Sequence, residues 1–137
     1  MPPAPNILFV HSDQHRFDTL GANGHPLVRT PHLDRLAREG INFSHAFSTI
    51  PICCPARASL MTGSWPSQHG CVCNPGTTIY RPARPDLPVL TDLLKTAGYR
   101  IGWIGRFHRE VAGSPTDYGV DDYVPAADYN TWRKAQG

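Results

Sequence analysis

Apolar and polar positions in the first half of the chain predict a strand, a helix and a second strand. The run Asn6–Val10 is apolar without alternation, which is typical of a strand buried on both faces of a parallel sheet. Thr30 suits a helix N-cap, Pro31 suits the first helical position, and apolar residues at helical spacing continue to Gly40, so we expect a helix there. Apolar and polar residues then alternate over Ile41–Ser48, which indicates a strand.

The second half of the chain predicts two further helices and a strand. A helix is expected over Pro55–Gly63, followed by a turn-rich stretch over Ser64–Pro88. Leu87–Gly98 has the pattern of an amphipathic helix and Tyr99–Gly105 that of a strand, while the remainder is loop-like with a further helix beginning within residues 127–137. The apolar side of the amphipathic helix comprises Val89, Leu90, Leu93, Leu94 and Ala97. This order of elements predicts an α/β fold, a layered sheet with helices on both faces.

Composition narrows the class of protein without naming a function. The 137 residues suffice for one domain, and a net charge of +2 is too small to favour binding to nucleic acid or to a membrane surface. The apolar runs are too short for a membrane span or a signal-peptide core, so we expect a cytoplasmic, reducing environment. The four cysteines are Cys53, Cys54, Cys71 and Cys73. In such an environment a thiol is more often catalytic, metal-binding or buried than disulfide-bonded.

The stretch around the adjacent cysteines carries the strongest chemical signal. Pro55 opens the predicted helix just after Cys53, so the positive end of the helix would face an anion bound there. Arg57, one turn further, can reach back and orient oxygen atoms through charge-assisted hydrogen bonds. The alternatives are a buried thiol at Cys53 or a four-cysteine zinc site, although the spacing lacks the usual Cys-x-x-Cys pairs.

A second candidate site lies where the first predicted strand ends. Asp13 and Gln14 follow that strand, and ligands of open α/β sheets bind at the carboxyl ends of strands. Carboxylate and amide oxygens both ligate hard cations. The alternatives are a helix cap or turn carboxylate for Asp13 and an ordinary loop residue for Gln14.

The pattern Cys53-x-Pro55-x-Arg57, continued by Met-Thr-Gly, resembles the signature of the sulfatase family within the alkaline-phosphatase-like superfamily. Residues 6–21, 30–48, 87–108 and 115–123 also resemble successive segments of that family, so the likeness covers nearly the whole chain in order. The Asp13-Gln14 pair followed by His-Arg resembles bacterial members near the choline-sulfatase and phosphonate-monoester-hydrolase branches.

The resemblance implies a set of catalytic residues. Cys53 would be converted to formylglycine by a formylglycine-generating enzyme, because only Cys53 has proline two residues on and arginine four residues on. Arg57 would orient the resulting hydroxyls, and His108 matches the histidine that contacts the nucleophile and the sulfate. Arg106 stands where the family usually has lysine; it keeps the charge but cannot donate a proton near neutral pH. The histidine of the Ser-Gln-His-Gly stretch, His69, has a family counterpart and is either functional or structural.

The resemblance also implies a metal site. Asp13, Gln14 and the modified Cys53 would be ligands, with Gln14 standing where many sulfatases have a second aspartate. We expect Ca²⁺, with Mn²⁺ and Mg²⁺ as alternatives. His45, on the apolar face of the predicted strand, is expected to be a core histidine instead.

Residues 1–137 thus resemble the N-terminal part of a sulfatase catalytic domain, with the C-terminal half absent. The implied function is hydrolysis of a small-molecule sulfate ester, incomplete without further residues. The alternatives are a phosphonate or phosphate diester hydrolase of the same superfamily, or a non-catalytic truncated remnant. Two modes of assembly stay open, association with a missing C-terminal segment and a homo-oligomer.

Overall fold

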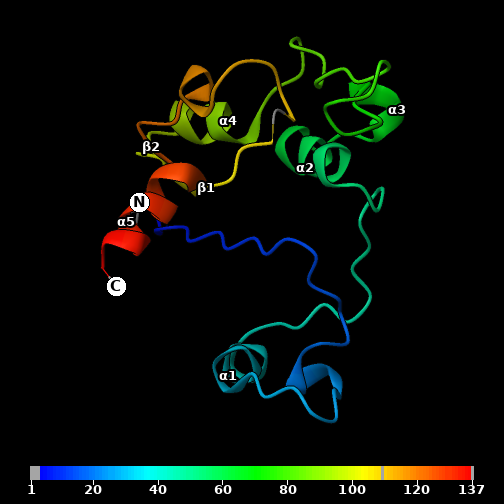
Figure 1. The fold of residues 1–137 in the computed structure, drawn as a ribbon, viewed down its shortest axis with the longest axis vertical. Helices are drawn as coiled ribbons and strands as arrows, with labels where there is room; N and C mark the ends of the chain where they lie inside the picture. Colours follow the sequence, from blue (N-terminus) through cyan, green and yellow to red (C-terminus); the bar gives the residue numbers. More distant parts are fainter. Residues whose placement is uncertain (1–3, 109, 137) are drawn as a thin grey trace. The chain divides into compact units, whose positions relative to one another are not determined.

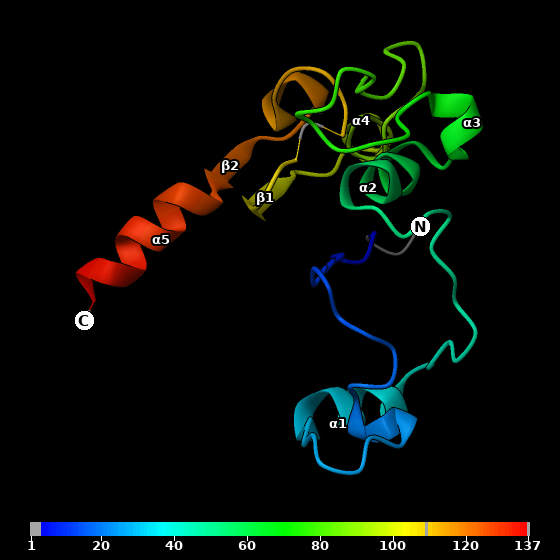
Figure 2. The same ribbon diagram turned by 45° about the vertical axis from the view of Figure 1, so that its right-hand side comes forward.

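The structure, a computed structural model, describes residues 4–108 and 110–136. The chain divides into two compact units, Met1–Phe47 and Ser48–Gly137, drawn in Figure 1 and turned in Figure 2. Within the described residues, no helix combines the length and the apolar character needed to cross a lipid bilayer.

The first unit contains the 3-10 helix η1 (Gly21–Asn23) and the α-helix α1 (Pro31–Glu39). The helix α1 confirms the prediction from Pro31 to the stop at Gly40, whose N–H donates to the carbonyl of Leu36. Thr30 precedes the helix but does not cap it with its side chain. Its hydroxyl instead accepts from the Gly21 N–H at 2.9 Å and donates to Asp34 Oδ1 at 2.7 Å, which ties η1 to the first turn of α1.

The two strands predicted for the first unit were wrong. Residues 6–10 and 41–48 have no regular secondary structure, and their large apolar side chains are exposed, Leu8 by 89% and Phe47 by 87%. A strand is stabilised by its hydrogen-bonded neighbours and by the layers on its faces. The described residues give neither segment such a neighbour, so the apolar pattern alone does not produce a strand here.

Within its described residues, the second unit holds four α-helices, a 3-10 helix, a short sheet and the core. Helix α2 spans Cys53–Thr62, two residues longer at its start than predicted, and Gly63 ends it in the left-handed conformation at φ 64° that favours glycine. The other elements in chain order are α3 (Pro66–His69), α4 (Leu90–Thr96), β1 (Gly102–Gly105), the 3-10 helix η2 (Pro115–Tyr118), β2 (Asp122–Pro125) and α5 (Ala126–Ala135). The sequence patterns missed α3 and β2, whereas α5 confirms the expected C-terminal helix; Gly137, the last residue of the predicted stretch, lies outside the described residues.

Strands β1 and β2 pair in parallel, with Gly102 opposite Asp122 and Trp103 opposite Tyr123. Parallel neighbours need a long connection, and here residues 106–121 supply it, including η2. Helix α5 follows β2 directly and contacts both strands. Helices combined with a parallel sheet agree with the predicted α/β class.

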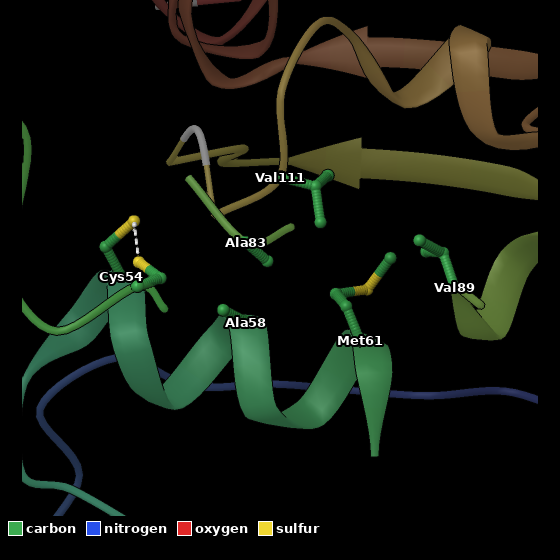
Figure 3. Close-up of a cluster of buried hydrophobic side chains, with 7 residues drawn as sticks. Cys54, Ala58, Met61, Ala83, Val89 and Val111 are labelled. Atoms are coloured by element: carbon green, nitrogen blue, oxygen red, sulfur yellow. Dashed lines mark hydrogen bonds between the residues drawn. The ribbon is translucent and has the colours of Figure 1, made fainter. Parts of the chain in front are cut away.

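One face of α2 forms the centre of the core. Cys54, Ala58 and Met61 point the same way from α2, at the spacing of one helical face, toward Ala83 and Val111 (Figure 3). Val89, Cys71 and the partly buried rings of Tyr80, Trp103, Phe107 and Tyr118 complete this cluster.

The amphipathic prediction for α4 was only partly right. Val89 and Thr91 are buried, whereas Leu90 is 40% exposed and Leu93 57% exposed. In the described residues α4 therefore packs through its first turn, and most of its apolar side stays open.

Candidate active site

Cys53 is the first residue of α2 and its side chain is half-buried. Two N–H groups of the first turn have partners: Cys54 donates to Asn74 Oδ1 at 2.9 Å and Ala56 to the carbonyl of Ile52 at 3.0 Å. Pro55 has no N–H to offer. The helix therefore acts on a group at Cys53 through the positive end of its dipole, and the N–H groups of Cys54 and Ala56 are not available as donors to that group.

Cys54 differs from its neighbour because it belongs to the core. Its side chain is fully buried, 3.7 Å from the sulfur of the equally buried Cys71 (Figure 3). Burial, followed by the proximity of Cys71, raises the pKa of Cys54 to about 12, and burial also raises the pKa of Cys71. Both groups remain neutral thiols near neutral pH and act as packing residues.

Three of the predicted catalytic residues lie in the second unit with Cys53. Arg57 is buried on α2, with 9% of its surface exposed. Arg106 and His108 follow β1, and the Arg106 guanidinium lies 3.3 Å from Nε2 of His108. The Cys54 thiol donates to the carbonyl of His108 at 3.3 Å, which joins this segment to the first turn of α2.

Glu110 is a neighbour of this group that the sequence patterns did not single out. It is 1% exposed, and its Oε2 accepts a hydrogen bond from the N–H of His108 at 2.7 Å. Burial raises the pKa of Glu110, while the backbone donors and the charges of Arg57 and Arg106 act in the opposite direction. A single acidic residue in a loop carries no periodic signal, so only the packing of the loop on α2 identifies it.

His69 has the contacts of a structural residue. It is fully buried, its Nδ1 accepts from the Cys71 N–H at 3.1 Å, and its Nε2 lies 2.9 Å from Ser59 Oγ. Burial lowers its pKa, so the ring is held neutral, with its proton on Nε2. His45, expected in the core, is instead exposed beside Ser44 Oγ, because the strand that would have buried it does not form.

Asp13 and Gln14 belong to the first unit, where both side chains are exposed. Gln14 has φ 54°, the one left-handed non-glycine residue in the described part of the chain. Such a conformation costs about 1–3 kcal/mol and tends to occur at functional sites. Residues 4–108 and 110–136 contain no group of three or more His, Cys, Asp or Glu side chains arranged to hold a metal ion. The four cysteines therefore do not form the alternative zinc site in this structure.

Comparison with known proteins gives a consistent result. Residues 5–136 match the model of the family described as Sulfatase. The chain is 40% identical over 107 residues to an ulvan-active sulfatase of Formosa agariphila and 35% identical over 152 aligned positions to steryl-sulfatase of Mus musculus. The crystal structure of the candidate sulfatase yidJ from Bacteroides fragilis superposes with a TM-score of 0.64 at 38% identity. This likeness confirms the predicted α/β fold class.

These matches cover much of this chain but little of its relatives. The alignment with the Formosa protein takes in 78% of the chain and 20% of that sulfatase; the corresponding shares for the mouse protein are 99% and 24%. For the Bacteroides structure they are 75% and 23%. The chain therefore spans about a quarter or less of each of these three relatives.

Proposed function

Because this chain belongs to the sulfatase family, we propose that it contributes the nucleophile-bearing part of a sulfuric ester hydrolase. One observation carries the proposal: Cys53 stands half-buried at the start of α2, and the next residue of that turn is bonded to the segment that bears Arg106 and His108. Cys53 and Arg57 lie on the first turns of this helix, and positive groups near such an end favour an anionic substrate, which supports the proposal.

Formylglycine is the proposed form of Cys53 in the active protein. When formed, it would supply a hydrated aldehyde: one hydroxyl would lose its proton as its oxygen bonds to sulfur, while the ester S–O bond breaks and the alcohol leaves with a proton. The second hydroxyl would then lose its proton and the C–O bond to the sulfate would break, which releases sulfate and re-forms the aldehyde, and addition of water would restore the hydrate. The positive end of α2 favours negative charge at this position. Arg57 lies one helical turn away and holds a permanent positive charge in a buried setting, where it acts strongly on a nearby anion.

Arg106 and His108 provide the second side of the proposed site. The guanidinium of Arg106 is exposed and offers a planar set of donors that can bind two sulfate oxygens together. It stays protonated, so a proton for the departing alcohol has to come from another group. His108, 3.3 Å from Arg106, is the residue of this pair that can exchange a proton near neutral pH.

We propose Asp13 and Gln14 as two ligands of a hard divalent cation, with Ca²⁺ first. Their oxygen donors suit such an ion, which would act as a Lewis acid on a sulfate oxygen. Ca²⁺ takes about six to eight oxygen ligands. Among the described residues, no three His, Cys, Asp or Glu side chains are arranged to hold a metal ion, so further ligands have to complete the site.

The test is conversion and turnover in the expressed protein, co-produced with a formylglycine-generating enzyme. Mass spectrometry of the peptide around residues 50–57 should find the aldehyde at Cys53. Cys53→Ala should abolish hydrolysis of an aryl sulfate, whereas Cys54→Ala should still be converted at Cys53 and should retain turnover at reduced stability. Conversion at Cys54 in the Cys53→Ala variant would contradict the assignment of the nucleophile.

The substrate class is tested in the same preparation. Turnover of an aryl sulfate well above that of an aryl phosphonate monoester supports the proposal. The reverse preference would favour a phosphonate or phosphate diester hydrolase, for which Gln14 beside Asp13 is the motivating feature. Absence of turnover with both substrates in the fully converted protein would favour a non-catalytic remnant.

A further inference from the structure

Glu110 places an acidic group where burial is costly. Its side chain is 1% exposed and lies next to the core formed by Cys54 and Val111. Removing a carboxylate from water costs several kcal/mol unless charges and hydrogen bonds compensate for the loss. A residue that only filled space here would be apolar, so the contacts of the carboxylate deserve an explanation.

The contacts of Glu110 converge on the backbone of His108. Oε2 of Glu110 accepts from the His108 N–H at 2.7 Å, while the carbonyl of His108 accepts from the Cys54 thiol at 3.3 Å. Both polar backbone groups of His108 are therefore fixed, one by the carboxylate and the other by α2. The position of Glu110 itself is fixed, because its carbonyl accepts from the Ala83 N–H at 2.9 Å.

The carboxylate is also close enough to the cationic residues of the candidate site to interact with them. The charges of Arg57 and Arg106 both favour its ionised form. Only one carboxylate oxygen is used in the described part of the chain, since Oε1 has no hydrogen-bond partner there. A half-satisfied buried carboxylate is a poor way to stabilise a fold. Its hydrogen bond to the His108 backbone and its charge interactions with Arg57 and Arg106 suit it to holding those groups in one arrangement.

We propose that Glu110 is a positioning residue that clamps His108, and with it the Arg106 side of the anion site, against the first turn of α2. This inference rests on the proposed function. Glu110 does not touch the substrate; it acts through the His108 backbone. Removing the acceptor frees the N–H of His108 and lets the 106–108 segment move. The side chains of Arg106 and His108 would then bind a sulfate oxygen more weakly.

Two substitutions separate the clamp from simpler roles. Glu110→Gln removes the charge but keeps an oxygen acceptor for the His108 N–H. Glu110→Leu keeps an apolar side chain of similar size but removes the acceptor. Val111→Ala is the matched control, because it removes packing at the adjacent buried position and leaves the Glu110 acceptor in place. The probe is inorganic sulfate, measured as a competitive inhibitor of aryl-sulfate hydrolysis and by hydrogen exchange at the His108 amide.

The clamp predicts about tenfold weaker sulfate binding and about tenfold faster exchange of the His108 amide in Glu110→Leu. Glu110→Gln should stay within about threefold of the wild type in both, and Val111→Ala should leave sulfate affinity unchanged. If the carboxylate acted only by its charge, both Glu110 variants would bind sulfate more tightly, because a repelling anion is removed; that result would overturn the proposal. Equal affinities in Glu110→Leu and the wild type would overturn it as well.

Failure of the proposed function looks different. A converted wild-type protein that neither hydrolyses aryl sulfate nor binds sulfate would refute the sulfatase assignment and the clamp together. Wild-type turnover with an unaffected Glu110→Leu variant would refute the clamp alone.

Discussion

Acidification should destabilise the second unit through His69. Protonation of this ring has to place a hydrogen on Nδ1, the atom that now accepts from the Cys71 N–H at 3.1 Å. The charged ring would also be buried, since none of the His69 surface is exposed. Burial lowers the pKa of His69 in the folded protein. The unfolded chain therefore takes up a proton below its pKa of about 6.5, while the folded chain resists it.

The sign and the upper limit of the effect follow from this difference. Below pH about 6.5 the unfolded state binds more protons than the native state, so the free energy of unfolding falls as the pH falls. The slope cannot exceed about 1.4 kcal/mol per pH unit for one group. Over one pH unit below about 6.5, this maximal loss of unfolding free energy corresponds to a fall of about 3–6 °C in Tm for a chain of this size. Glu110 acts in the opposite direction, because its raised pKa favours the fold as the carboxylate becomes protonated.

The assay is urea unfolding at several pH values between about 7.5 and 5.5, followed by tryptophan fluorescence. All three tryptophans, Trp65, Trp103 and Trp132, lie in the second unit, so the signal reports on that unit. His69→Gln removes the titrating ring, and the difference in slope between this variant and the wild type cancels the contribution of Glu110. The exposed His32, changed to Gln, is the control and should keep the wild-type slope. Identical slopes in the wild type and His69→Gln would refute the reasoning.

Two further predictions concern the core on α2. Met61→Ala should lower the free energy of unfolding by about 2–5 kcal/mol, because Met61 is 6% exposed and a cavity would remain. Leu60→Ala, one residue away and 41% exposed, should cost clearly less; equal losses in urea titrations would argue against the packing in Figure 3. Cys54, with a pKa of about 12, should resist maleimide at pH 8 in the folded protein while the half-buried Cys73 reacts. Because the unfolded chain loses the Cys54 proton at lower pH than the folded chain, the stabilising contribution of Cys54 should be lost as the pH rises from about 9 to 12. Peptide mapping that found both cysteines labelled at one rate would contradict the burial of Cys54.

The sequence predicted helices better than strands, for a physical reason. A helix satisfies its backbone within its own residues, and local signals such as Pro31 and Gly63 mark where it begins or ends. A strand depends on a partner that is distant in sequence. The apolar run at residues 6–10 reads as a strand but has no partner in the described residues, whereas β2 has a weak pattern and forms because β1 pairs with it.

The same distinction applies to the candidate site. Cys53 and Arg57 lie one helical turn apart, so their relation could be predicted from spacing alone. The contact of the Cys54 thiol with the carbonyl of His108 joins residues 54 positions apart, and the Glu110 carboxylate is significant only because its loop packs on α2. No local pattern encodes such contacts.

The adjacency of Cys53 and Cys54 has a structural explanation that does not depend on the motif. Successive residues of an α-helix point about 100° apart, so two neighbours at the start of α2 cannot share one environment. Cys54 faces the core and donates to His108, with a pKa raised to about 12 by burial. Cys53 is not part of that core and remains half-buried at the positive end of the helix. A thiol that has to be modified and then meet a substrate needs access, and a thiol that has to join the helix to the His108 loop needs burial. The difference in burial therefore supports the proposal that Cys53 is the modified residue, on grounds that do not use the proline and arginine that follow it.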